Sequence, residues 1–286
     1  ILIPLIVVPQ LLLSGVVIPY DDLITPRSRV RAVPLYADIL PPRWGYEALA
    51  VRQYTGNAYT RHILEADARV RLAEFDLDHY LPEVLSLIQS LPLLREEDKS
   101  DEIAGNIRIL RSEIPRLEKR TGIAAPVLAA GNGPKELDEA AGRRLEDYVA
   151  ACRKMIFEQR KEAAAEKRAV LDRLEQEMGA EGLDALKRRH TNRSIEKQAL
   201  NLQDLEPIGR AEDGLYQKVL PIYQLPQSPW GNAHFLAGWK RLGERVYPTF
   251  VFNMAVLAVL TAILYLLLWV KALPRLLNAE GARRRV

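Results

Sequence analysis

The residues best able to bind metals or form cross-links are few in this sequence and widely scattered. The histidines are His62, His79, His190 and His234, and none has the His-Glu-x-x-His spacing that places two zinc ligands on one helix face. The only cysteine is Cys152, and one thiol forms neither an internal disulfide nor a cysteine metal cluster. We therefore interpret these residues as packing or surface residues and expect no metal site.

Three short motifs belong to types that can bind a cation, hold a phosphate or supply a nucleophile. Asp76 and Asp78 form a carboxylate pair, but a cation site needs further ligands, and none is suitably spaced. Residues 131–135, Gly-Asn-Gly-Pro-Lys, have the wrong spacing for a phosphate-binding loop and lack its Ser or Thr. Ser14 lies in an apolar stretch without the context of a nucleophile elbow. We therefore expect a chain that is not an enzyme and holds no cofactor itself.

Charge and hydrophobicity favour a membrane partner over nucleic acid. The 286 residues include 40 Lys or Arg and 37 Asp or Glu, a net charge of +3, so no basic field argues for nucleic-acid binding. Hydrophobic residues make up 48% of the chain, and they gather at its two ends. The elements that position any functional residue are therefore expected to be membrane segments at both ends with a polar region between them.

The C-terminal apolar stretch predicts a final transmembrane helix, assigned to residues 250–270. Phe250 to Trp269 carries no formal charge, and its length at 1.5 Å per residue gives about 30 Å, the thickness of a hydrocarbon core. Tyr247 and Trp269 flank it as interfacial anchors would. The tail at 271–286 is basic, which is typical of the cytoplasmic side. The alternative, a buried core helix, rarely runs so far without a charge.

The N-terminal apolar stretch is the second predicted membrane segment. Residues 1–22 are interpreted as the end of a transmembrane helix followed by a re-entrant segment, with Pro4, Pro9 and Pro19 tolerated where neighbours satisfy the backbone. A signal peptide would need a basic leading region and a small-residue cleavage site, and neither is present. Because residue 1 falls inside the apolar stretch, we expect the chain to be a C-terminal piece of a longer polypeptide.

Between the two ends the sequence predicts a connector, a helical domain and a lead-in to the last span. The connector and an amphipathic interfacial helix take residues 23–63, the extracytoplasmic helical domain 64–228, and the amphipathic lead-in 229–249. The expected location is the cell membrane, the bacterial inner membrane, with several spans and the middle domain outside the cytoplasm. Basic residues near the outer side weaken the charge argument, although long translocated domains follow the positive-inside rule poorly.

The stretch from Pro41 to Ile63 is rich in aromatic residues, with Trp44, Tyr46, Tyr54 and Tyr59. Its amphipathic pattern suits a helix lying at the membrane interface. A core-packed helix is the alternative, and the pattern does not decide between the two.

The middle of the chain has helical periodicity and no convincing strand pattern, so the predicted fold class is all-α. Apolar residues in the longest segment, 135–178, alternate at three- and four-residue spacings from Leu145 to Met178, which is typical of coiled-coil packing. We expect an antiparallel helical hairpin or small bundle. The remaining predicted helical segments are 66–91, broken near Pro82, then 98–121 and 183–202.

Three stretches carry a family resemblance through their order and spacing. They are VPQLLLSGVVIPYDDL (8–23), LPPRWGYEALAVRQYTGNAY (40–59) and AHFLAGWKRLGERVYPTFVFNMAVLAVLTAILYLLLW (233–269). Together they resemble the end of the membrane domain of ABC-2-type exporters of the ABCG-like subfamily. The match is best to bacterial forms that join a forkhead-associated domain, an ATP-binding cassette and a permease in one chain. The family motif RW-x-[YF]-E-A-L matches Arg43 to Leu49, and Lys240 to Asn253 matches the entry to the last helix.

The resemblance implies a permease portion of an ATP-driven exporter that pairs as a homodimer. ATP and Mg would be bound by a cassette absent from these residues, and the partners would be membrane lipid, the remaining transporter helices and that cassette. The chain departs from the eukaryotic ABCG pattern because its outer domain is far longer and lacks the loop cysteines. The resemblance implies an outer gate or pathway at Pro9, Gln10, Ser14 and Gly15. It implies an interfacial motif at Arg43, Trp44, Tyr46 and Glu47. It also implies an intramembrane polar group, Asn253.

A membrane-anchored helical interaction or scaffold protein of the cell envelope is the alternative function. In that case the helical domain would bind a partner and the apolar ends would only tether it. The two hypotheses combine if the outer domain docks an envelope accessory protein. The transported substrate is left open, because a pathway is specified by more helices than these residues contain.

Overall fold

The computed structural model describes residues 2–15, 20, 33–126 and 139–270, and it is mostly helical. The predicted basic tail, 271–286, and most of the connector before residue 33 lie outside the described residues. The helical elements are α1 (Leu2–Leu12), α3 (Leu35–Asp38), α4 (Pro41–Thr55), α5 (Thr60–Phe75), the π-helical turn η1 (Asp76–Tyr80), α6 (Leu81–Glu96), α7 (Ser100–Thr121), α8 (Glu139–His190), α9 (Arg193–Leu200), the 3-10 turn η2 (Pro221–Tyr223) and α10 (Thr249–Trp269). The strands are β1 (Ile208–Ala211), β2 (Gly214–Gln217), β3 (Trp239–Leu242) and β4 (Arg245–Pro248).

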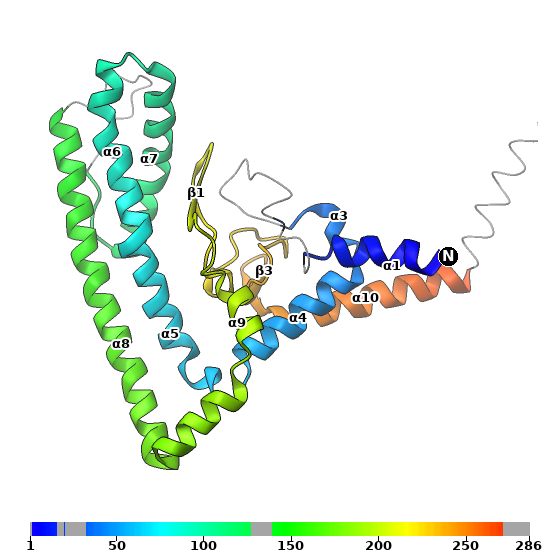
Figure 1. Cartoon of the computed structure of the whole chain (residues 1–286). Coiled ribbons are helices and arrows are strands. Elements are labelled where there is room, and N and C mark those ends of the chain that lie inside the picture. Colours follow the sequence, from blue (N-terminus) through cyan, green and yellow to red (C-terminus); the bar gives the residue numbers. More distant parts are fainter. Residues whose placement is uncertain (1, 16–19, 21–32, 127–138, 271–286) are drawn as a thin grey trace, which may run out of the picture.

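The elements form two arms that meet at an angle (Figure 1). One arm is a bundle of α5, α6, α7 and α8, in which α8 runs along α5 and α6, and α7 packs on α6. The other arm contains α1, α4 and α10. Helix α9 and the two β-hairpins lie between the arms, so the predicted helical domain is joined to the apolar end segments by a folded region.

Helix α8 confirms the predicted segment 135–178 over its described residues, and its kink falls between that segment and the next predicted one, 183–202. Gly179 adopts φ 76° and ψ 162°, which lies outside the helical region and is a conformation that glycine adopts readily. The chain then continues helically to His190. The predicted interruption near Pro82 takes a milder form. The π turn η1 joins α5 directly to α6, and Pro82 is the second residue of α6, immediately after this widened turn.

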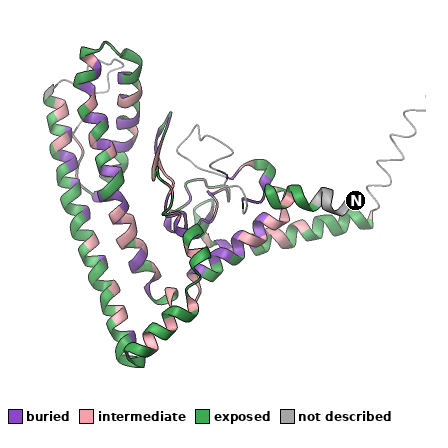
Figure 2. Cartoon of the chain, viewed as in Figure 1, coloured by how far each residue is buried: buried purple, intermediate pink, exposed green. Residues whose placement is uncertain are grey.

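The predicted apolar stripe of α8 is buried only in part. Leu145, Val149, Cys152 and Ile156 are buried, as are the isolated residues Ala163 and Leu174. The remaining predicted members are Gln159 and Met178, which are exposed, and Val170, which is half-buried. The upper part of α8 therefore packs in a bundle, whereas its lower part packs mainly against α5 and leaves most side chains in contact with solvent (Figure 2).

Four short strands correct the prediction of an all-α fold. They form two separate antiparallel hairpins, β1–β2 with Ala211 opposite Gly214, and β3–β4 with Leu242 opposite Arg245. Each hairpin has a two-residue loop; Gly214 follows the first loop and Gly243 is part of the second, and glycine is favoured in tight hairpin turns. Strands of four residues give too little alternation to stand out from helical periodicity, and the β3–β4 hairpin occupies the second half of the predicted lead-in.

One core runs through both arms. Buried side chains from α4, including Val51 and Tyr54, belong to the same hydrophobic cluster as those of α6, α7, α8, β2 and η2. The cluster includes Leu81, Leu110 and Ile222, each no more than 2% exposed. Residues on both sides of the boundary predicted near residue 63 therefore contribute to one hydrophobic cluster, and the division itself stays a prediction.

Within the described residues, α10 is long and apolar enough to cross a membrane. It has 21 residues, and its last six, Leu264 to Trp269, are all exposed (Figure 2). Helix α1 has 11 residues, against about 20 for a crossing. The part of the chain that the structure describes thus contains one candidate span, and the predicted multi-pass arrangement stays a prediction.

Candidate functional site

Helix α4 presents the predicted motif residues to the first turns of α10. Pro41 and Pro42 stand in the first turn of α4, where proline is favoured, and the helix packs along the first half of α10 (Figure 1). Trp44 lies 6.3 Å from Phe252 between ring centroids, and the Arg52 guanidinium lies 5.9 Å from the ring centroid of Phe250. The two helices are therefore antiparallel neighbours.

Glu47 is the centre of a buried polar network that joins α4, α10 and the β3–β4 hairpin. Its side chain is 0% exposed. Its Oε1 accepts hydrogen bonds from Lys240 Nζ at 2.9 Å and from the Leu236 backbone N–H at 3.1 Å. Its Oε2 accepts from Asn253 Nδ2 at 2.9 Å, and Nδ2 also donates to the Trp44 carbonyl at 3.2 Å. We call Arg43, Glu47, Lys240 and Asn253 the polar junction.

Arg43 completes the polar junction from one turn before Glu47. Its side chain is 1% exposed and its Nη2 lies 3.7 Å from Glu47 Oε2, while Nη1 lies 3.4 Å from Asp38 Oδ1. The guanidinium carbon stands 3.8 Å from the ring centroid of Trp44, whose Nε1 donates to the Asp38 carbonyl at 2.8 Å. Among the described residues, Nε and Nη1 of Arg43 find no hydrogen-bond partner. The cation is therefore held by charge and stacking more than by hydrogen bonds.

Charges inside the polar junction keep Glu47 ionised. Burial alone opposes ionisation, but the Lys240 ammonium, the Arg43 guanidinium and the hydrogen bonds from Lys240 and Asn253 outweigh it, so the pKa of Glu47 lies below its usual value. Burial lowers the pKa of Lys240, and the Glu47 carboxylate opposes that shift. An ammonium bound to an ionised carboxylate at 2.9 Å is the state that satisfies both groups.

Tyr46, the other predicted motif residue, points away from the polar junction. Its hydroxyl hydrogen-bonds Gln198 on α9, and its ring stacks on Phe235 with centroids 6.3 Å apart. Phe235 also meets the ring of Tyr20 edge-on at 5.3 Å. The interfacial motif is therefore divided between two contacts, and α4 is packed against protein over much of its surface, as the core-packed alternative expects.

The structure does not bring the predicted outer-gate residues into the polar junction. Pro9 is exposed and Gln10 half-buried on α1, while Ser14 and Gly15 are buried just after it. The Ser14 hydroxyl donates to the carbonyl of Leu11 at 2.7 Å, a local bond with no partner on α4 or α10. Their role in a gate stays a prediction.

A second polar cluster, centred on Asp67, joins α5, α8 and η2. Asp67 accepts hydrogen bonds from Lys167 Nζ at 2.6 Å, Arg71 Nε at 2.9 Å and the Tyr223 hydroxyl at 2.7 Å. The Tyr223 and Tyr54 hydroxyls share a hydrogen bond of 2.7 Å. Burial would raise the pKa of Asp67, but the bonds from Lys167 and Tyr223 and the Arg71 charge outweigh it, so its pKa is lowered.

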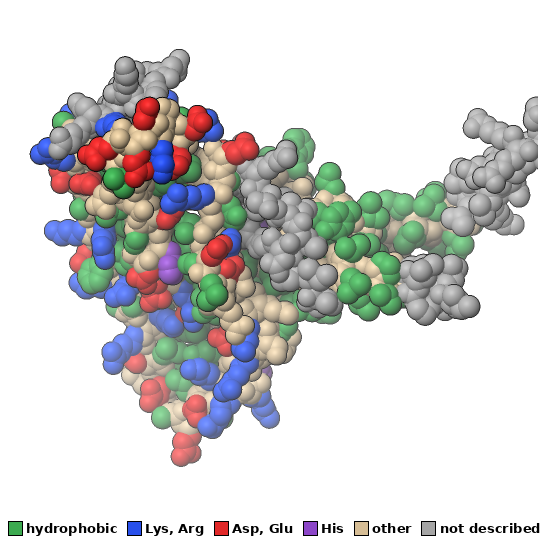
Figure 3. Space-filling model, turned by 45° about the horizontal axis from the view of Figure 1, so that its top comes forward, with side chains coloured by type: hydrophobic (Ala, Val, Ile, Leu, Met, Phe, Trp, Pro, Cys, Tyr) green, Lys and Arg blue, Asp and Glu red, His purple; other side chains and the backbone are tan. Residues whose placement is uncertain are grey.

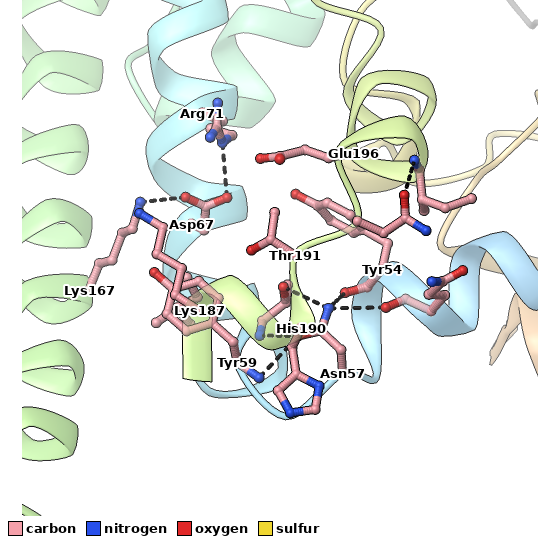
Figure 4. Close-up of a pocket in the computed structure, with 15 residues that line it drawn as sticks. Tyr54, Asn57, Tyr59, Asp67, Arg71, Lys167, Lys187, His190, Thr191 and Glu196 are labelled. Atoms are coloured by element: carbon pink, nitrogen blue, oxygen red, sulfur yellow. Dashed lines mark hydrogen bonds and ion pairs between the residues drawn. The ribbon is translucent and has the colours of Figure 1, made fainter. Parts of the chain in front are cut away.

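The Asp67 cluster borders a cavity of about 180 Å³ between α4, α5, the end of α8 and the start of α9 (Figure 4). Lys187, His190 and Glu196 line it, and none of the three makes an ion pair with another described residue. Asp67 is already neutralised by Lys167 and Arg71. The cavity therefore offers both charged and hydrogen-bonding groups for a small polar ligand.

The carboxylate pair singled out in the sequence is divided. Asp76 is 1% exposed and forms an ion pair with Arg120, whereas Asp78 is exposed. Burial raises the pKa of Asp76 to about 7, because the opposing charge of Arg120 compensates only part of the desolvation. Among the described residues no three His, Cys, Asp or Glu side chains gather where a metal ion would need them.

Sequence reasoning identified Arg43, Trp44, Glu47 and Asn253 separately but did not identify Lys240 as their buried partner. Lys240 looked like a basic residue near the membrane, and it is 0% exposed. Its position on β3 gave no signal, because the hairpin that turns it inward was not expected. The Asp67 cluster was missed for a similar reason, since its members lie up to 156 positions apart.

Comparison with protein-family models, with curated proteins and with solved structures finds no significant match to this chain. The polar junction, the candidate span and the sequence resemblance are therefore the features from which a function can be proposed.

Proposed function

We propose that this chain is the C-terminal permease portion of an ATP-driven exporter, with a large outer helical domain attached to its last membrane helix. The observation that carries the proposal is the polar junction, in which motif residues of α4 hold the first turns of the candidate span. Arg43, Glu47 and Asn253, three residues marked by the resemblance, lie in one buried contact. Asn253 lies 206 positions after Glu47 in the sequence, so their contact is a specific feature of the fold.

The polar junction suits the transmission of movement between membrane and outer domain. Glu47 is bound at once to α10 through Asn253 and to β3 through Lys240, and the core of α4 continues into the bundle. A buried network of this kind breaks only at a high cost, so α4, α10 and the hairpin are expected to move as one body. In an exporter, closure of ATP-binding cassettes on the cytoplasmic side would reach the outer domain through this body.

The distribution of side chains supports a membrane location for the α1–α10 arm. Hydrophobic side chains cover its visible face, whereas Lys, Arg, Asp and Glu gather over the α5–α8 bundle (Figure 3). Helix α10 has the length and apolar composition of a crossing. Its C-terminal half is exposed in the single chain. We propose that further transporter helices, a second copy of the chain and lipid cover that half, and that ATP and Mg bind to a cassette outside these residues.

A membrane-anchored scaffold of the cell envelope is the second candidate. The lower half of α8 favours it, because a long, charged and mostly exposed helix presents a surface for a partner. In this case the polar junction would only fix the outer domain to its anchor. No cassette would be needed.

The mass and composition of the native assembly distinguish the two candidates. The assembly would be extracted from its source membrane in mild detergent, with its mass measured intact and its polypeptides identified. An exporter requires two copies of this chain and an ATP-binding cassette, either on the same polypeptide or as a bound subunit. An assembly that contains the chain but no nucleotide-binding domain would rule out the exporter and leave the scaffold.

A further inference from the structure

The β3–β4 hairpin and Trp230, which is bridged to it, expose a group of apolar side chains that the proposed function leaves unexplained. Trp230 is 84% exposed, Leu242 53%, Val246 46% and Trp239 40%. We call these four residues the hairpin surface. Single exposed apolar residues are ordinary, but two tryptophans and two aliphatic residues on one short hairpin mark an interaction site.

The hairpin surface lies level with the first turn of α10. Trp230 pairs with Leu242 in an isolated bridge, and the Gly231 N–H donates to the Arg241 carbonyl at 2.7 Å. The backbone of Gly231 is in contact with Phe252, since a Cβ at residue 231 would lie 2.6 Å from ring atom Cζ. Gly231, the residue after Trp230, therefore stands beside Phe252, the fourth residue of the candidate span.

The hairpin is held rigidly at that level. Strand β4 ends at Pro248 and α10 begins at the next residue, Thr249, with no linker between them. The Thr249 N–H donates to the Gly238 carbonyl at 3.1 Å, and the Thr249 hydroxyl donates to the Ala237 carbonyl at 2.5 Å. On the inner face of β3, Lys240 is bound to Glu47. Trp239 and Val246 lie on the face of the hairpin opposite Lys240 and cannot turn inward without breaking the polar junction, whereas Leu242, at the end of β3, is bridged to Trp230.

We propose that the hairpin surface is seated in the headgroup layer of the lipid bilayer, beside the point where α10 enters the membrane. The proposal rests on the proposed function only in requiring that α10 crosses the membrane. Tryptophan favours this layer, because its ring is apolar while its N–H needs a polar partner. Arg241 and the exposed Arg245 flank the surface and suit lipid phosphates, with one nearby acid, Glu244.

Continuity with α10 identifies lipid, rather than a soluble protein, as the occupant. A bilayer around α10 necessarily surrounds whatever lies level with its first turn, and Trp230 lies there. The headgroup layer adds about 5–7 Å beyond the hydrocarbon on each side, enough to contain a tryptophan ring. The hairpin would thereby fix the depth and tilt of α10 and, through Lys240, of the polar junction.

Spin labels at three positions of the full chain test the proposal. Cysteine would be introduced separately by Trp230→Cys, Leu264→Cys and Leu205→Cys, and each label measured in vesicles of phosphatidylcholine and phosphatidylglycerol. Leu264 lies in the second half of α10 and is 59% exposed, and Leu205 is 98% exposed in the loop after α9. The native Cys152 is 0% exposed and resists labelling in the folded chain. Accessibility to oxygen, which enters lipid, is compared with accessibility to a water-soluble nickel chelate.

The expected result is a loss of chelate accessibility at residue 230 relative to residue 205, with residue 264 protected most strongly. A label at 230 as accessible to the chelate as the label at 205, with 264 protected, would overturn the hairpin proposal and leave the span intact. A label at 264 that is open to the chelate would overturn the span itself. The two failures are therefore distinguishable in one set of samples.

Discussion

Replacing Glu47 by glutamine tests whether the polar junction holds the outer domain to α10. Glutamine keeps the size of the side chain and an acceptor oxygen for the Leu236 N–H, but it removes the negative charge. Lys240, 0% exposed, then loses the carboxylate that its Nζ contacts at 2.9 Å. The substitution therefore isolates the ionic part of the network.

The expected loss of stability is large because both partners are buried. Removing one member of a buried ion pair costs about 3–5 kcal/mol, since the other charge stays desolvated and unpaired. The lower end, about 3 kcal/mol, is expected for glutamine because its amide oxygen still accepts a hydrogen bond from Leu236. The variant Glu47→Ala, which also orphans that N–H, should reach the upper end.

The free energy of unfolding of the full chain in detergent micelles would be measured from the loss of helical circular dichroism against denaturant. Glu65→Gln on α5 is the matched control, because Glu65 is exposed and its replacement should cost no more than about 0.5 kcal/mol. Adding Lys240→Met to Glu47→Gln should restore part of the loss, since the stranded ammonium is then gone. Equal stabilities for the Glu47→Gln and Glu65→Gln proteins would refute the reasoning.

Three further predictions concern Asp76, Gly231 and Gly45. The pKa of Asp76, about 7 in the folded chain, exceeds its unfolded value, so its contribution to stability is full below pH 4 and is lost as the pH rises to 7. Asp76→Asn should remove this slope from a pH series of unfolding free energies, worth at most about 4 kcal/mol, and Asp78→Asn should retain it. Gly231→Ala should lower the free energy of unfolding by about 1–3 kcal/mol in the same denaturant assay, because φ there is 78° and the added Cβ would overlap the Phe252 ring. An unchanged unfolding midpoint would contradict the hairpin geometry. Gly45→Ala, in the interior of α4 with no atom within 4 Å of its Cβ position, should instead stabilise by about 1 kcal/mol, and a loss would show a neighbour that the single chain lacks.

Helical periodicity predicted the long elements well because burial imposes it directly. The segment 98–121 corresponds to α7, whose buried Ile103, Ile107, Leu110 and Ile114 follow the spacing seen in the sequence. The kink at Gly179 falls between the predicted segments 135–178 and 183–202. The β-hairpins were not predicted, since strands of four residues carry little periodic signal.

The polar junction shows the limit of reasoning from sequence. Glu47 and Asn253 were each selected by the resemblance, but their contact depends on how α4 lies along α10, which no local pattern specifies. Lys240 joins them only because β3 turns its side chain inward. The Asp67 cluster depends in the same way on the return of the chain through η2 to α5.

The most direct test of the central claim is Mg-ATP hydrolysis by the native assembly reconstituted in lipid. The account predicts hydrolysis that copurifies with this chain, with a rate altered by Glu47→Gln and left unchanged by Glu65→Gln. An assembly that hydrolyses no ATP would contradict the exporter. An active assembly in which both variants behave alike would contradict the coupling role of the polar junction.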